Sequence, residues 1–91
     1  MADDTKKHRA FVAELMWSKP VTALPGIGEK KLGKNLRTQG FTRASAVLGH
    51  FVQMGRDPEK FKKWLKDDIR AKIHQADLCT RALVEWCDAF L

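Results

Sequence analysis

The segment Pro25-Gly26-Ile27-Gly28 has the residue types and the spacing that could bind an anion. Glycine has no Cβ, so a bulky anion can come close to the backbone N–H groups of such a turn. A helix that begins directly after the turn adds the positive end of its dipole, which favours negative charge. Nothing in the turn selects a base, so the chemistry that it indicates is phosphate binding.

Three lysines follow the turn closely, at Lys30, Lys31 and Lys34. We expect all three on the helix after the turn, with Lys30 and Lys34 four residues apart on one face. The alternatives are an ordinary turn in which proline and glycine only end a helix, and a loop for nucleotide phosphates. The second is weak because no strand precedes the turn and no Gly-Lys-Ser/Thr follows it.

Apolar residues anchor the turn on both sides, at Leu24, Leu32 and Leu36. With these anchors the sequence resembles a helix-hairpin-helix, a motif that binds DNA without reading its sequence. We expect the motif to span about residues 20–39.

The elements that must position this turn are all helical, because no segment alternates long enough to form a strand. We predict an all-α, single-domain protein of five to six helices over residues 1–91. Gly40 and Gly55 have the position and type of residues that end helices, and Thr42 could cap a helix from Arg43 to about Met54. The remaining predicted helices are one from about Asp4 to Met16, a short one at Pro20, one that starts at Asp57-Pro58-Glu59, and an amphipathic last helix that buries Phe90.

Composition limits the possible functions. A chain of 91 residues has room for one core but not for a separate catalytic domain. Residues 73–91 carry one arginine against three acids, so the rest of the chain holds more than the whole net charge of +6. That asymmetry favours a polyanion on one side of the molecule. Two cysteines make no disulfide framework, which fits a reducing compartment, and no apolar run is long enough to span a bilayer.

Stretches from both ends of the chain and from its middle match one family pattern. They are Lys7-His8-Arg9, Phe11-Val12-Ala13-Glu14, Lys19-Pro20-Val21, Gly26-Ile27-Gly28-Glu29, Val47-Leu48-Gly49, Trp64-Leu65-Lys66-Asp67 and Glu85-Trp86-Cys87-Asp88-Ala89-Phe90-Leu91. The last is the most specific because it is long and contains rare residues. Over almost its whole length the sequence resembles the barrier-to-autointegration factor family.

The resemblance implies a small helical protein that forms a two-fold homodimer and is not an enzyme. Each subunit of such a dimer binds double-stranded DNA through its hairpin, so one dimer bridges two duplexes. The implied partners are LEM-domain proteins of the inner nuclear membrane, lamins and histones. The implied location is the nucleus, at chromatin and the nuclear envelope, and also the cytoplasm, with no direct membrane insertion. No cofactor or metal is implied.

The resemblance also assigns roles to residues. It places DNA contacts at Lys7, Gly26, Ile27, Gly28, Lys72, His74 and Gln75, and physical reasoning from the turn adds Lys30 and Lys34. It places dimer contacts at Val47, Leu48, Gly49 and Phe51. Phosphorylation in such proteins falls on a Ser/Thr-rich N-terminus, where this chain has only Thr5 as an acceptor, beside Asp3 and Asp4.

Other departures from the family pattern remove positive charge or change a partner surface. Asp77 stands where an arginine is common and His74 where a lysine is frequent, which predicts weaker DNA binding. Gln53 and Gly55 depart from the pattern near the surface that binds LEM domains. The turn that usually contains glycine is lost at Arg70, which predicts a longer helix there.

Four alternatives remain to be weighed. A protein adaptor with weakened DNA binding is favoured by the lost positive charges. DNA glycosylases and repair nucleases also carry such hairpins, but no pair of carboxylates follows this one at a suitable distance. Trp17 could stack on a base. A zinc site is disfavoured because Cys79 and Cys87 fit the apolar face of the last helix rather than a metal-ligand spacing.

Overall fold

Helices make up the part of the chain that the computed structural model describes, residues 19–91. They are η1 (Val21–Ala23), α2 (Leu32–Thr38), α3 (Ala44–Gln53), α4 (Pro58–Asp67) and α5 (Ile73–Phe90). Within these residues the only β pairing is an isolated bridge between Pro20 and Arg43. The all-α prediction is confirmed, and the described residues hold one 3₁₀ turn and four α-helices. The predicted helix at residues 4–16 and Trp17 lie outside the described residues.

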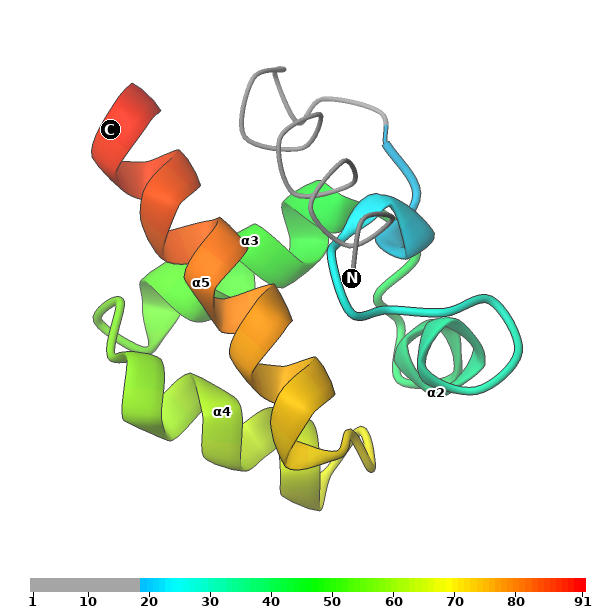
Figure 1. The fold of residues 1–91 in the computed structure, drawn as a ribbon. Helices are drawn as coiled ribbons and strands as arrows, with labels where there is room; N and C mark the ends of the chain where they lie inside the picture. The colour runs from blue at the N-terminus through cyan, green and yellow to red at the C-terminus, as the bar shows by residue number, and fades with distance from the viewer. Residues whose placement is uncertain (1–18) are drawn as a thin grey trace.

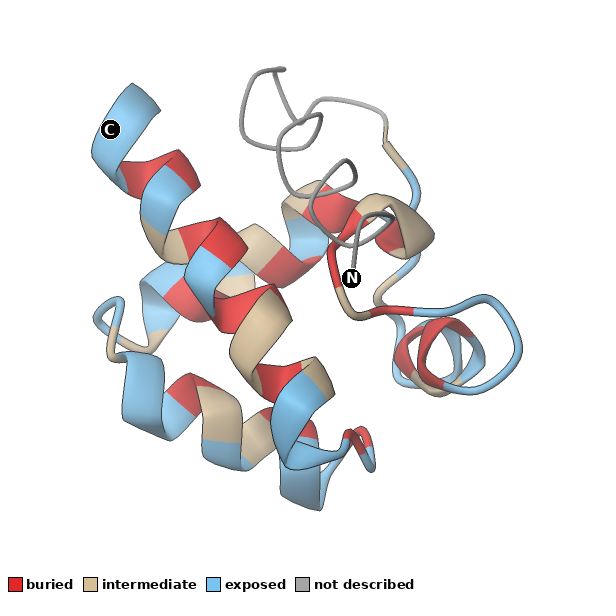
Figure 2. Cartoon of the chain, in the orientation of Figure 1, coloured by how far each residue is buried: buried red, intermediate tan, exposed pale blue. Residues whose placement is uncertain are grey.

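Helix α5 is the longest element, and α4 runs alongside it (Figure 1). On the other side of α5, η1 packs against α3 and α2, and the hairpin loop joins η1 to α2. Buried positions recur along one face of the helices (Figure 2). The largest fully buried side chains include Phe51, Phe61, Leu24, Leu36 and Leu83, so the hairpin and the helices share one core.

Glycines end α2 and α3 as the sequence predicts. Gly40 has a φ of +92°, and its N–H donates to Arg37 O at 3.0 Å while Phe41 N–H donates to Leu36 O at 2.8 Å. This pair of bonds satisfies carbonyl groups that the helix leaves open at its end. Gly55, with a φ of +74°, ends α3 through the same pair of bonds.

The starts of α3 and α4 differ from each other in how they are capped. Asp57 caps α4, because its side chain accepts from the backbone N–H groups of Glu59 at 3.0 Å and Lys60 at 3.3 Å. The predicted cap at Thr42 is wrong: Arg43 occupies the cap position of α3 and makes no side-chain capping bond. There the chain is held instead by the backbone, through the Ala44 N–H bond to Lys19 O at 2.9 Å.

The predicted lengthening of a helix at Arg70 is also wrong. Helix α4 ends at Asp67, α5 begins at Ile73, and Arg70 takes a φ of +72°. Side chains of α2 and of its C-cap residue hold this connection: Asn35 Nδ2 donates to Ile69 O at 2.8 Å, and Gln39 Nε2 donates to Asp68 O at 2.9 Å. These bonds take the carbonyl groups that a continued helix would use. Phe90, expected in the core, is 43% exposed because it lies at the last turn of α5, beyond the core.

Candidate nucleic-acid interface

The hairpin loop begins with a tight turn. Ile27 N–H donates to Leu24 O at 3.1 Å, with Pro25 second in the turn and Gly26 third, at a φ of +81°. Proline followed by a residue with positive φ is the combination that a type II turn requires. The side chains of Leu24 and Ile27 are both buried, so the turn is fixed to the core from both ends.

Gly26 lies directly against the start of α5. A Cβ at this position would be 2.6 Å from the backbone oxygen of Gln75 and 3.2 Å from Leu78 Cβ. Only glycine allows this approach, and the approach brings the hairpin and the segment 72–75 together. Gln75 also holds its own segment, because its Oε1 accepts from Lys72 N–H at 2.9 Å. Two regions that the sequence names separately as DNA contacts therefore form one surface.

Gly28 differs from Gly26 in its surroundings. It is exposed, its φ lies outside the left-handed region, and a Cβ there would meet nothing within 4 Å. Among residues 19–91 no hydrogen-bond acceptor is seen for its N–H. The chain's own packing does not require glycine at this position, so the open approach to the backbone is available to a ligand.

Gly33 is a contact that the sequence reasoning missed. Its N–H donates to Gly28 O at 2.7 Å, and a Cβ would be 2.8 Å from that oxygen and 3.0 Å from Thr22 Cγ2. Gly33 thus lets α2 pack directly on the loop. The available signal was a glycine inside a predicted helix, which costs about 1 kcal/mol against alanine and calls for a packing reason.

The positions of the lysines relative to α2 differ from the prediction. Helix α2 begins only at Leu32, so Lys30 lies in the turn before it and Lys31 at its cap, and the shared helical face of Lys30 and Lys34 is wrong. The Gly33–Gly28 bond holds the intervening residues in a loop. Lys30, Lys31 and Lys34 are all exposed. The acid among them, Glu29, is paired with Arg37 at 2.8 Å, which offsets its charge.

A family profile described as barrier to autointegration factor matches residues 2–90. The human barrier-to-autointegration factor is 51% identical over 87 residues, which cover 96% of this chain and 97% of that protein. Barrier-to-autointegration factor A of Xenopus laevis is 50% identical over the full length of both chains, and the Drosophila melanogaster factor is 45% identical over the full length of both. The chain belongs to the barrier-to-autointegration factor family.

In this family member the residues named for the dimer divide into two groups. Val47 and Phe51 are fully buried in the chain's own core. Leu48 is partly buried and Gly49 is exposed, and Val52 beside them is 42% exposed. Leu48, Gly49 and Val52 therefore form a solvent-facing part of α3, which Val47 and Phe51 support from within.

The carboxylate of Asp77 forms ion pairs with two basic side chains of the same chain. Asp77 Oδ1 lies 3.4 Å from Lys62 Nζ, and its Oδ2 lies 3.8 Å from Arg81 Nη1. These pairs take up part of the positive charge of two basic residues. Lys72 and His74 are exposed at the start of α5, whereas Lys7 and Thr5 lie outside the described residues.

The cysteines lie on the buried face of α5, as predicted. Cys79 and Cys87 are both buried and unbridged, and burial raises the pKa of the Cys87 thiol although Arg56 beside it acts in the opposite direction. The thiols thus pack as small apolar groups. Within residues 19–91 no three metal-ligating side chains gather, and none of the helices there has the length and apolarity needed to cross a bilayer.

Proposed function

We propose that this family member binds double-stranded DNA without sequence preference, through the surface formed by the hairpin loop and the start of α5. The observation that carries the proposal is the contrast at the loop: Gly26 is packed against Gln75 O, while Gly28 is open to solvent. A rigid loop with an accessible backbone is what a phosphate group requires, because the N–H groups are already held in place.

Charge supports the same ligand. Lys30, Lys31 and Lys34 are exposed around the loop, and Lys72 is exposed at the adjoining start of α5. Lysines contact phosphates whatever the base sequence, so the affinity should come from counterion release. The proposed DNA surface consists of the described residues Gly26, Ile27, Gly28, Lys30, Lys34, Lys72, His74 and Gln75. The resemblance to the family adds Lys7. No catalytic step and no cofactor is part of this proposal.

The oligomeric state, the location and the protein partners are inferred from the family and from the exposed part of α3. We infer a homodimer in which two hairpins hold two duplexes, with the exposed part of α3 at the seam. The same inference places the protein at chromatin and the nuclear envelope, with LEM-domain proteins, lamins and histones as partners. Modification of Thr5 would lower DNA affinity, because a phosphate adds negative charge near the DNA.

The proposal is tested by titrating the protein into two duplexes of unrelated sequence at several salt concentrations, with fluorescence anisotropy as the readout. We expect equal affinities for the two duplexes. The logarithm of the affinity should fall with the logarithm of salt concentration by about 0.9 per phosphate neutralised. A marked preference for one duplex, or a flat salt dependence, would contradict phosphate-driven binding.

A protein adaptor is the second candidate, favoured by Asp77 and its contacts with Lys62 and Arg81. In this function the surface near the hairpin is too weakly basic to hold DNA. Absence of binding to either duplex at low salt would support it. Restored binding in an Asp77→Asn variant would then attribute the loss to that carboxylate.

A further inference from the structure

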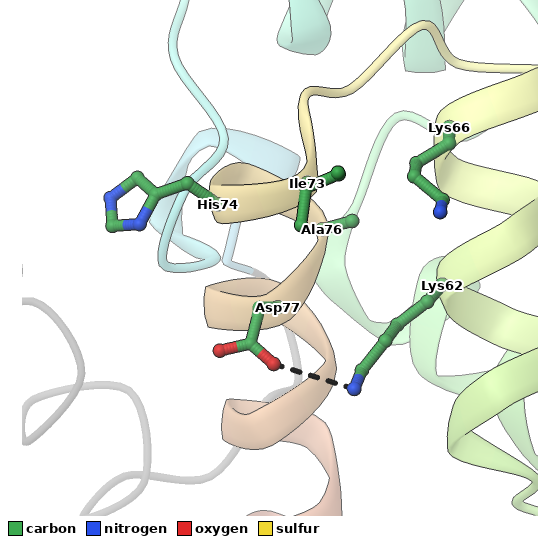
Figure 3. A pocket seen from close by; sticks show the side chains of 6 residues that line it. All are labelled: Lys62, Lys66, Ile73, His74, Ala76 and Asp77. Atoms are coloured by element: carbon green, nitrogen blue, oxygen red, sulfur yellow. Dashed lines mark ion pairs between the residues drawn. The ribbon is translucent and has the colours of Figure 1, made fainter.

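A hollow on the other flank of α5 shares only His74 with the proposed DNA surface. It has a volume of about 380 Å³ and lies between α4 and the first turns of α5 (Figure 3). Its lining residues are Lys62, Lys66, Ile73, His74, Ala76 and Asp77. The hairpin touches α5 through Gln75 and Leu78, whereas Ile73, Ala76 and Asp77 turn toward α4, so the two surfaces lie on different flanks of the same turns.

One apolar residue of the hollow, Ile73, is unusually exposed. Ile73 is 75% exposed, more than the other large hydrophobic side chains that stand out at the surface of residues 19–91. It adjoins Ala76 in the close view (Figure 3). An exposed isoleucine gains nothing for the folded chain, but covering it would remove apolar surface from water, which favours binding.

The two lysines of the hollow differ in whether acids of the described chain balance their charge. Lys62 Nζ lies 3.4 Å from Asp77 Oδ1 and 3.6 Å from Glu59 Oε1, so its charge is balanced within the chain. Lys66, on the same helix one turn further, forms no ion pair with any residue from 19 to 91. An incoming carboxylate would therefore find an ammonium group with no competing partner there, next to the exposed Ile73.

We propose that this hollow binds a short acidic segment of another protein, in which an apolar side chain covers Ile73 and a neighbouring carboxylate pairs with Lys66. An apolar anchor combined with an acid matches both features of the hollow. A nucleic acid matches them less well, because it presents phosphates along its whole length, whereas the hollow offers, among the described residues, a single unbalanced lysine beside an exposed apolar side chain. The residues that carry this proposal, Ile73 and Lys66, are not among those proposed to contact DNA, so it does not depend on DNA binding.

The test is a selection of short random peptides on the full-length protein, carried out without DNA. We expect the selected peptides to carry leucine, isoleucine or phenylalanine next to aspartate or glutamate. Labelled copies of the best peptide are then titrated into variants. Ile73→Glu and Lys66→Glu should each weaken binding by at least about tenfold. Both positions are exposed, so neither change removes a core contact.

Matched controls separate the hollow from general charge. Lys63→Glu makes the same charge change on an exposed position of α4 outside the hollow and should alter the affinity by less than about twofold. A peptide with lysine in place of its acid should bind Lys66→Glu better than the original protein. Peptides without the acidic and apolar pattern, or insensitive to Ile73→Glu, would overturn the proposal. Displacement of the peptide by duplex DNA in a Gly28→Glu background would also overturn it, by assigning the hollow to nucleic acid.

Discussion

The hairpin and helix α3 both contain glycines, but the fold explains them differently. In the hairpin region, Gly26 and Gly33 each touch backbone oxygens so closely that a Cβ would lie within 3 Å of them. In α3, Gly49 lies in the middle of a helix, is exposed, and a Cβ there would meet nothing within 4 Å. Gly28 resembles Gly49 in this respect, although it belongs to the hairpin.

This difference separates structural from functional glycines. Where the chain itself fills the space beside a glycine, a substitution should lower stability. Where that space is open, a substitution should leave the fold intact and affect whatever binds there. By this criterion Gly28 is a contact for a ligand and Gly49 is a contact for a second copy of the chain. Each assignment can be tested by a measurement.

The largest effect is expected from Gly26→Ala. The substitution places a side chain at a φ of +81° and a Cβ 2.6 Å from Gln75 O, so the turn must move away from α5. We expect the free energy of unfolding to fall by about 3 kcal/mol, measured by urea denaturation.

Gly40→Ala is the matched control for Gly26→Ala. Gly40 has a similar φ of +92°, but a Cβ there would meet nothing within 4 Å. Its loss should therefore reflect the backbone conformation alone, about 1 kcal/mol. Equal losses in the two variants would show that the contact with α5 does not hold the hairpin.

Local signals predicted some elements of this fold well. Gly40, Gly55 and the Asp57-Pro58 start act through their own backbone or their immediate neighbours, and each ends or begins a helix as the sequence indicates. The break at residues 68–72 could not be predicted in this way. It is held by the side chains of Asn35 in α2 and of Gln39 at the end of that helix, which lie about thirty residues earlier in the chain.

The candidate site shows the same limit. The turn at Gly26 and Gly28 was evident from residue types, but the contact between Gly26 and Gln75 depends on how α5 docks. The placement of Lys30 outside α2 depends on the Gly33–Gly28 bond, which delays the start of the helix. Local propensity describes what a segment can form, and tertiary contacts decide where it begins.

The second largest effect is expected from Gly28→Glu, which tests whether Gly28 contacts the ligand. The added side chain finds open space, so the free energy of unfolding should change by less than about 0.5 kcal/mol. The carboxylate would stand where we place a phosphate, and duplex affinity measured by anisotropy should fall by at least about tenfold. Gly28→Ala, which adds bulk without charge, should lose much less. Unchanged affinity in a folded Gly28→Glu protein would exclude the hairpin as the DNA site.

The smallest effect is expected from Gly49→Ala, which should raise the stability of the protomer and lower the stability of the dimer. Alanine is the better helix former by about 1 kcal/mol, and no atom of the described chain lies where its methyl group would go. The protomer should become more stable, while a second copy packed closely on α3 would be pushed away, so the dimer should dissociate more readily in sedimentation equilibrium. Unfolding must be followed at several protein concentrations, because dimerisation adds to the apparent stability. Lys63→Ala, on the exposed face of α4, controls for general changes in helix propensity. A more stable protomer with an unchanged dimer would place the seam away from Gly49 and leave this glycine without a functional reason.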